Sequence, residues 1–281
     1  MKKLSIFIIS GLILFSCGIK NLTEIKEKLK NPKSLCLYND GILISNTFGN
    51  SEIGYFSLLK NRKNEELISG TVIAAATAIK NNYFFAANYD KITVYNLNDA
   101  KIVTEISIDI PTDSIMDYVE ISDLLVAGGT LFISTEIGII YLLNIENPEN
   151  IDKNTLFPYV TTIKNPSAML MIDYHLFIGS SSENADENGL YMIDDLSNPA
   201  PRKMFFDDAQ IYSMILSKDK TKIIFTDFLQ NGKLGFYTFE TNEVTYKTVA
   251  DTTSTLGDLL YYQDKLYVCD SANDRILILE E

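Results

Sequence analysis

The chain has 281 residues and a formal net charge of −13 at pH 7, and 46% of its residues are apolar. This apolar fraction is enough for a sizeable core, whereas the acidic excess repels phosphate backbones and argues against nucleic-acid binding. The same charge repels anionic lipid, so we expect any membrane attachment to depend on acyl chains rather than on a basic patch.

The first sixteen residues, MKKLSIFIISGLILFS, have the order of a secretion signal: two lysines, an apolar run and a small residue before Cys17. The apolar run is shorter than the ~20 residues of a membrane-spanning helix. The ending LFSC resembles the lipobox of bacterial lipoproteins. This resemblance implies cleavage before Cys17, lipidation of that cysteine and, because Gly18 follows it, sorting to the outer membrane. A buried helix that ends by chance at Cys17 is the alternative.

Removal of residues 1–16 deletes two lysines and no acid, which leaves a net charge of −15. Besides Cys17, only Cys36 and Cys269 remain, and each lies inside an apolar run. We therefore expect two buried free thiols. A disulfide between them is the alternative in an oxidising compartment, provided that their Cα atoms lie within ~7 Å.

A short apolar run with strand character recurs six times along the chain. If the residues at the centre of each copy are taken as equivalent, the copies are 42 to 47 residues apart, which is the spacing of propeller blades. The copies are ILISN (42–46), YFFAAN (83–88), LFIST (131–135), LFIGS (176–180), IIFTD (223–227) and LYVCD (266–270).

One apolar run precedes each copy and another follows it, and five of the six units then have a fourth extended segment. Val, Ile, Tyr, Phe and Thr dominate these runs, with Asn, Asp, Gly and Ser between them, as in antiparallel strands and their turns. The pattern predicts an all-β fold, a six-bladed β-propeller with four antiparallel strands in each blade. The sixth unit lacks its fourth strand. NLTEIKEKLK (21–30) can supply it and close the ring, because an open edge would invite aggregation; a short helix there is the rival interpretation.

We therefore divide the chain into a signal peptide (1–16), a lipidated N-terminus with the closing strand (17–30) and one propeller domain (31–281). Residues 139–157 and 189–206 resemble the LVIVD repeat, in which an apolar strand is followed by Asp or Asn and then by an Asn-Pro turn. LYVCDSANDRILIL resembles an NHL-type repeat instead. These resemblances cover less than half of the chain. They imply a propeller on the bacterial envelope or cell surface, and they assign no catalytic residue. The matching positions are Ile140 to Asn144 with Asn147 and Pro148, Leu190 to Asp194 with Asn198 and Pro199, and Asp270, Asn273 and Arg275.

A small polar residue ends each of the six repeated strands, and we expect the turns that follow to gather on one face around the axis. In one interpretation each side chain accepts a hydrogen bond that starts its own turn. In the other, a polar ring faces a ligand, with Asn46, Asn88, Asp227 and Asp270 as binding residues. The six residues are Asn46, Asn88, Thr135, Ser180, Asp227 and Asp270.

The longest of these turns, SSSENADENG (180–189), is similar to oxygen-rich calcium loops, since it contains the spacing N-x-D-x-N-G. Asn184, Asp186 and Asn188 are the candidate ligands, and Asp195 falls at the twelfth position. Met192 at the ninth position offers no side-chain oxygen. A solvated hairpin turn is the alternative.

The longest irregular insert, residues 109–122, contains Tyr118 among other apolar residues and acids. It either plugs the channel or offers an apolar patch with an acidic rim for protein contact, with Tyr118 as a binding residue. His175 is the only histidine, so a His-rich zinc site is not available.

The sequence predicts a monomeric, lipid-anchored propeller on the bacterial outer membrane or cell surface. We expect a non-catalytic binding or interaction module for another envelope or surface protein, with calcium as the one cofactor to test. The alternative is a calcium-dependent, lactonase-like hydrolase or a lyase that uses carboxylates at the channel mouth. A third interpretation is a sugar or peptide in the channel, with Tyr261, Tyr262 and Tyr267 as one wall. The sequence identifies neither the partner nor which side of the membrane the domain faces.

Overall fold

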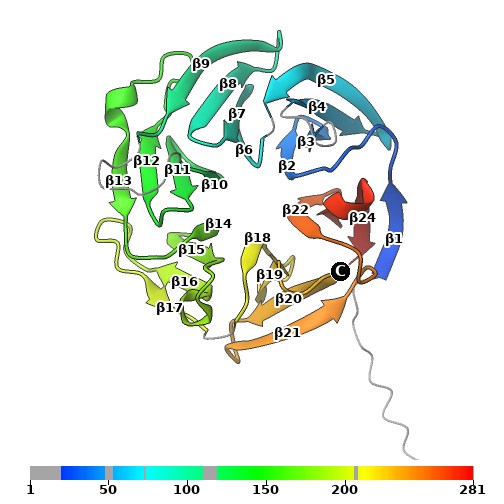
Figure 1. Ribbon diagram of the computed structural model, residues 1–281, viewed down its shortest axis with the longest axis vertical. Coiled ribbons are helices and arrows are strands. Elements are labelled where there is room, and N and C mark those ends of the chain that lie inside the picture. Colours follow the sequence, from blue (N-terminus) through cyan, green and yellow to red (C-terminus); the bar gives the residue numbers. More distant parts are fainter. Residues whose placement is uncertain (1–19, 48–52, 73, 110–118, 206–207, 281) are drawn as a thin grey trace, which may run out of the picture.

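The computed structural model describes residues 20–47, 53–72, 74–109, 119–205 and 208–280. These residues form six four-stranded antiparallel sheets that surround a central axis as blades (Figure 1). The predicted six-bladed β-propeller is therefore confirmed.

Each blade takes its strands in chain order from the axis outward, except that the outermost strand of blade six comes from the N-terminal side. Blade one has β2 (Ser34–Tyr38), β3 (Gly41–Thr47), β4 (Ile53–Lys60) and β5 (Lys63–Val72), and blade two has β6 (Ala76–Lys80), β7 (Tyr83–Asn88), β8 (Lys91–Asn96) and β9 (Lys101–Ser107). Blade three has β10 (Ile121–Ala127), β11 (Thr130–Thr135), β12 (Ile140–Asn144) and β13 (Phe157–Val160), and blade four has β14 (Pro166–Ile172), β15 (His175–Ser180), β16 (Gly189–Ile193) and β17 (Arg202–Lys203). Blade five has β18 (Ile211–Leu216), β19 (Lys222–Asp227), β20 (Lys233–Thr238) and β21 (Glu243–Thr248), and blade six has β22 (Leu256–Tyr262), β23 (Lys265–Asp270), β24 (Arg275–Glu280) and β1 (Lys20–Ile25). Three short 3-10 turns are η1 (Lys153–Thr155), η2 (Ala185–Glu187) and η3 (Ser271–Asn273).

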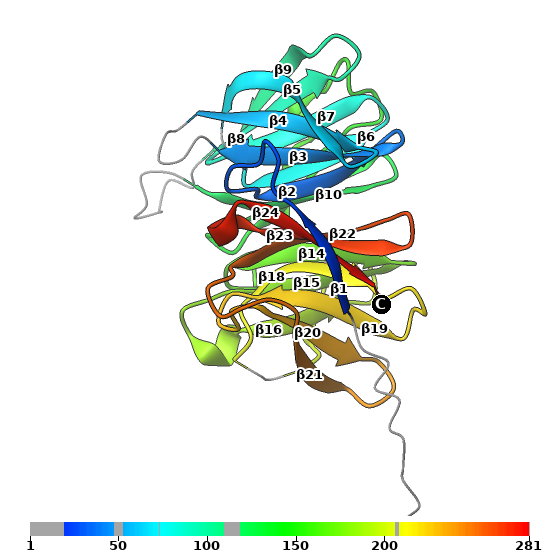
Figure 2. The ribbon, with the colours of Figure 1, turned by 90° about the vertical axis from the view of Figure 1, so that its right-hand side faces the viewer.

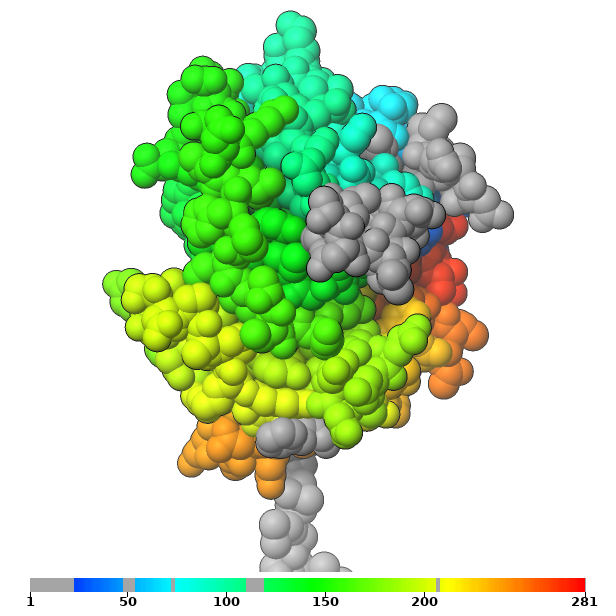
Figure 3. All heavy atoms as spheres, turned by 60° about the vertical axis from the view of Figure 1, so that its left-hand side comes forward, coloured from blue at the N-terminus to red at the C-terminus, as the bar shows by residue number. Residues whose placement is uncertain are grey.

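The second strand of each blade is the repeated apolar run found in the sequence. It is covered by a neighbouring blade on both faces, which is why it is apolar at nearly every position rather than at every other one. The outermost strands face solvent, and β21 is mostly exposed. Figure 3 shows the outer surfaces of blades three (green) and four (yellow-green) lying against each other.

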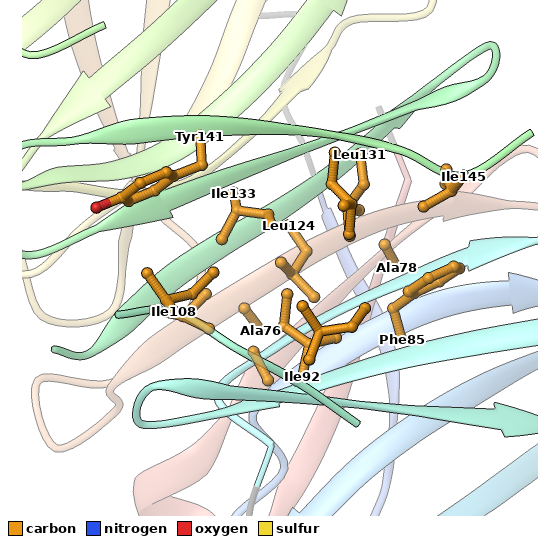
Figure 4. Packing of buried hydrophobic residues seen from close by; sticks show 14 of the residues in the cluster. Ala76, Ala78, Phe85, Ile92, Ile108, Leu124, Leu131, Ile133, Tyr141 and Ile145 are labelled. Atoms are coloured by element: carbon orange, nitrogen blue, oxygen red, sulfur yellow. The ribbon is translucent and has the colours of Figure 1, made fainter. Parts of the chain in front are cut away.

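The blades pack face to face, and the space between them narrows toward the axis. Between blades two and three, Ala76 and Ala78 of the innermost strand β6 pack in one cluster with larger residues of the second strands, such as Phe85 and Leu131 (Figure 4). At Gly179, in the second strand of blade four, a Cβ atom would come within 2.5 Å of the Ile211 side chain of the next blade. Small residues at such positions therefore let neighbouring blades pack closely.

The ring is closed by the N-terminal strand. β1 pairs antiparallel with β24, from Lys20 opposite Glu280 to Ile25 opposite Ile276, with a bulge in between. Figure 2 shows β1 (dark blue) running beside β24 (red) at the edge of blade six. The missing fourth strand of the sixth unit is thus residues 20–25, and the rival helix is not formed in this segment.

Cys36 and Cys269 are buried free thiols, in agreement with the expectation. Burial raises the pKa of Cys36 to about 12 and that of Cys269 well above its usual value, so both thiols stay protonated. In the described part of the chain, no helix is both long enough and apolar enough to cross a lipid bilayer.

Arg275 fastens the closing strand to blade six. Its Nη1 lies 2.7 Å from the Glu24 carboxylate of β1, and its Nε lies 2.7 Å from the fully buried Asp270 carboxylate. Its Nη2 lies 3.3 Å from Asp251 in the link that leads into the blade. One guanidinium therefore joins three parts of the seam.

We expect Arg275→Met to lower the free energy of unfolding by about 3 kcal/mol, because Asp270 would remain buried without its cation. The control is Arg202→Met, which removes a half-exposed pair with Asp194 and should change stability by less than about 0.5 kcal/mol. Urea denaturation measures both. Equal losses in the two variants would contradict the role given to Arg275.

Candidate functional site at the channel mouth

The six innermost strands begin on one face of the ring, which we call the channel mouth, and run away from it. One residue of each innermost strand lies beside the same position of the repeated second strand. Examples are Ser34 opposite Ser45, Asp123 opposite Ser134 and Ser213 opposite Thr226. We call this set the inner ring. Its members are Ser34, Ala76, Asp123, Ala168, Ser213 and Asp258.

A β-bulge accompanies the inner ring in blades three to six. The register of the innermost strand shifts there, for example between Ile121 and Asp123 and between Leu256 and Leu259. Bulges re-aim side chains, and here they direct polar inner-ring side chains at the adjacent blade. No strand lies on the axial side of an innermost strand, so its backbone amides that face the axis need other hydrogen-bond partners, and these side chains supply them.

Asp258 joins three blades. Its Oδ1 accepts hydrogen bonds from Ser213 Oγ at 2.6 Å and from Leu259 N at 2.8 Å. Its Oδ2 accepts from Leu35 N at 2.8 Å and from Ser34 Oγ at 3.2 Å. These four donors saturate the carboxylate, so its role is structural.

Asp123 occupies the equivalent position in blade three, opposite blade six in the ring. Its Oδ2 accepts from Met169 N of blade four at 2.6 Å, and its Oδ1 accepts from Leu124 N at 2.8 Å. Two donors leave about half of its acceptor capacity free. Asp123 was not among the predicted site residues, although the recurrence of SDLL (122–125) and GDLL (257–260) is a signal that could have found it.

Burial disfavours the ionised form of both acids. It raises the pKa of Asp123 to about 7, helped by the charge of Asp258 and opposed by the amides of Met169 and Leu124. Burial also raises the pKa of Asp258, opposed by its four donors.

The inner ring surrounds a cavity of about 150 Å³ to which all six blades contribute. Its polar lining comes from Lys33, Ser34, Thr77, Ser122, Asp123, Tyr212, Ser213 and Asp258. A smaller hollow of about 80 Å³, which we call the apolar groove, shares Lys33 and Tyr212 with the cavity and is also lined by Pro32, Phe228, Leu256 and Gly257. The mouth thus combines a polar centre with an apolar side.

Two large apolar residues are exposed beside the groove. Phe228 is 62% exposed and Leu229 is 49% exposed, in the turn that follows β19. Asp227 fixes this turn: its Oδ1 accepts from Leu229 N at 3.0 Å and from Gln210 N at 3.1 Å, and its Oδ2 accepts from the Tyr246 hydroxyl at 2.6 Å. The apolar pair is therefore held in place rather than collapsed onto the core.

The polar residues that end the second strands mostly bond to nearby loops. The Asn46 amide donates to Ile44 O and Ser57 Oγ, and its oxygen accepts from Lys30 N at 3.4 Å. Thr135 bonds to Ile139 across its turn, and Asp270 is occupied by Arg275 and its neighbours. Asn88 lies half-buried at the end of β7. Thr135 and Asp227 therefore start their own turns, whereas Asn46 bonds within blade one and Asp270 pairs with Arg275. A ligand role for the ring stays a prediction.

The calcium-like loop contains η2. The Asn184 side chain accepts from Asp186 N at 3.3 Å, whereas Asp195 accepts from both Ser197 N and Ser197 Oγ in a separate turn. Asn188 is buried, with its Nδ2 3.5 Å from Asp208 Oδ1. Among the described residues, no three His, Cys, Asp or Glu side chains are grouped as a metal ion would require. Calcium binding therefore stays a prediction.

The remaining predicted residues lie elsewhere. Cys17 and Tyr118 are outside the described residues. Tyr262 donates to Asp40 O and packs edge-on against Tyr267, with 6.0 Å between ring centroids, at the end of β22 far from the cavity. These tyrosines are not part of the cavity lining.

Comparison with known proteins shows the fold. No protein-family model and no curated protein matches the chain, so the resemblance to LVIVD and NHL-type repeats stays a prediction. The Cps50 (Swd1) β-propeller domain of Myceliophteria thermophila aligns with a TM-score of 0.64 and 10% identity, over 94% of this chain and 100% of that one. Kuenenia stuttgartiensis hydrazine synthase aligns with a TM-score of 0.62 and 13% identity, over 88% of this chain and 75% of that one. At such identities only the propeller architecture is shared.

The raised pKa of Asp123 predicts a pH-dependent stability. The folded protein holds this proton more tightly than the unfolded chain, so the free energy of unfolding falls as the pH rises from about 4 to about 7, and then levels off. Asp123→Asn cannot ionise, so across this window its stability should rise relative to wild type by up to a few kcal/mol. Urea denaturation at a series of pH values measures the difference.

The control for this experiment is Asp219→Asn. Hydrogen bonds from Ser217 and Thr221 lower the pKa of Asp219 to about 2. Here the free energy of unfolding of the wild type should rise relative to that of the variant as the pH rises, and this change should occur only below about pH 4. A difference between Asp123→Asn and wild type that does not vary with pH would contradict the assignment of Asp123.

Proposed function

We propose that this protein is a lipoprotein of the bacterial outer membrane or cell surface, anchored through Cys17, and that it binds another envelope or surface protein at the channel mouth. The observation that carries the binding proposal is the exposed Phe228 and Leu229 pair beside the apolar groove. Protein contact sites typically combine an apolar centre with a polar rim, and an aromatic residue beside a pocket is a common energetic centre. The bonds of Asp227 present this pair without a further loss of loop entropy on binding.

The geometry of blade six supports the combination of anchoring and binding. β24 starts near the mouth and ends at Glu280 on the opposite face, where Lys20 of β1 pairs with it. Only residues 18 and 19 separate Cys17 from β1, which is a reach of roughly 10 Å. A lipid on Cys17 would therefore hold the opposite face near the membrane and leave the mouth directed away from it. The resemblance of blades three and four to LVIVD repeats points to the same envelope location.

A calcium-dependent hydrolase or lyase is compatible with the same fold. Its predicted carboxylates at the mouth already accept hydrogen bonds. Asp227 accepts from Leu229 N of its own turn, from Gln210 N and from the Tyr246 hydroxyl. Asp270 accepts from Asn273 Nδ2 of its own turn and from Arg275 Nε. This is why we favour binding. Calcium-dependent turnover of a lactone by the purified protein would support the enzyme instead.

Cys17→Ser should abolish lipidation. We expect the wild-type protein to take up labelled palmitate and to sediment with membranes, whereas the variant should carry no label and remain in the soluble fraction. Fractionation of labelled cells measures both properties. If the wild type carries no label, or if the variant carries as much label as the wild type, the anchoring proposal is wrong.

Charged residues in the apolar pair should prevent partner binding. In cross-linking pulldowns from intact envelopes, Phe228→Asp with Leu229→Asp should lower recovery of the partner at least about tenfold, because the apolar centre of the contact would be lost. The control is Tyr174→Asp, on the opposite face, where the side chain is 82% exposed. Recovery that is unchanged in the double variant, or reduced equally in both, would argue against this surface.

A further inference from the structure

The central cavity contains opposite charges that do not meet. Lys33 enters it from blade one and Asp123 from blade three. Among the described residues, no carboxylate lies within ion-pair distance of Lys33, and its ammonium makes no hydrogen bond. The Tyr212 hydroxyl, which enters from blade five, is likewise without a partner in the described part of the chain.

Separated charges of this kind are unfavourable in an enclosed space, because each loses hydration without gaining a partner. Burial lowers the pKa of Lys33, although the nearby charge of the Glu120 carboxylate partly opposes the shift. Asp258 has four donors and needs nothing more, whereas Asp123 retains free acceptor capacity. The unsatisfied groups of the cavity therefore include one ammonium, one phenol hydroxyl and half of one carboxylate.

The three groups come from alternate blades and lie at one level of the channel. Lys33, Asp123 and Tyr212 lie within one residue of the inner-ring level in blades one, three and five. Lys33 and Tyr212 also line the apolar groove beside Gly257 of blade six, which is opposite the blade of Asp123. The volume of about 150 Å³ is close to that of an engineered protein cavity that binds benzene, so a molecule of several heavy atoms fits.

We propose that this cavity binds a small zwitterion of the size of an α-amino acid. Its carboxylate bonds to the Lys33 ammonium and the Tyr212 hydroxyl, and its ammonium bonds to the Asp123 carboxylate. A simple anion would face Asp123 and Asp258, a simple cation would face Lys33, and a neutral sugar would leave both charges unpaired. Only a ligand with both charges satisfies the three groups together.

This proposal goes beyond the binding of a protein partner, and its test contains no such partner. Isothermal titration of the detergent-solubilised mature protein would use glycine, L-alanine, L-serine and L-valine, with glucose as the neutral probe. Two further probes are halves of L-alanine: ethylamine lacks the carboxylate, and propionate lacks the amine. We expect at least one amino acid to bind, and both half-molecules to bind at least tenfold more weakly.

Lys33→Met and Asp123→Asn should each weaken amino-acid binding at least tenfold. Lys33→Met is the decisive variant, because Lys33 has no partner to lose and the fold should tolerate the change. Lys91→Met, at an exposed position at the start of β8, is the control and should leave the affinity unchanged.

The proposal is overturned if no amino acid of the panel binds, or if propionate, ethylamine or glucose binds as tightly as the best amino acid. It is also overturned if Lys33→Met retains full affinity. None of these outcomes bears on the pulldown with the Phe228 and Leu229 variant, so the two proposals fail separately.

Discussion

The pairing of β1 with β24 turns a row of blades into a ring, and the seam, the channel and its cavity all follow from this closure. In an open row, blade six would present an unpaired edge, and blades one and six would each lack a packed face. Closure brings Leu35 of blade one to blade six, where Asp258 accepts its amide hydrogen. Arg275 holds the same seam at its outer edge through Glu24. The closed ring then encloses the cavity and places Lys33 in it.

Inside the ring, stability and the proposed ligand binding make different demands on the same residues. The inner edges of the blades expose amides that no strand covers, and buried carboxylates are strong acceptors for them. Asp258 serves this purpose fully, whereas Asp123 satisfies Met169 and Leu124 and still has capacity left. Burying these acids is unfavourable at neutral pH, and local conflicts of this kind tend to occur at functional sites. The exposed Phe228 on the rim is a second departure from what folding alone would favour.

The architecture could be predicted from the sequence because every blade repeats the same strand lengths, apolar runs and turn residues. The same reading identified the closing strand from what the sixth unit lacked. The channel could not be predicted in this way. A bulge decides that Asp123 reaches the next blade, and bulges leave little trace in composition. Lys33 and Tyr212 lie far apart in the sequence and meet only in the ring. Phe228 comes shortly after a buried apolar run, so the sequence does not show that this side chain, unlike those before it, is exposed.

The proposed function requires the channel mouth to be the binding face and to be directed away from the membrane. Hydrogen exchange of the protein in intact envelopes, compared with the purified protein in detergent, measures which face is covered. We expect slower exchange in residues 227–233 and 254–258 at the mouth, with no change in the turns at 173–175 and 263–265 on the opposite face. Protection of the opposite-face turns alone, or no protection at the mouth, would contradict it.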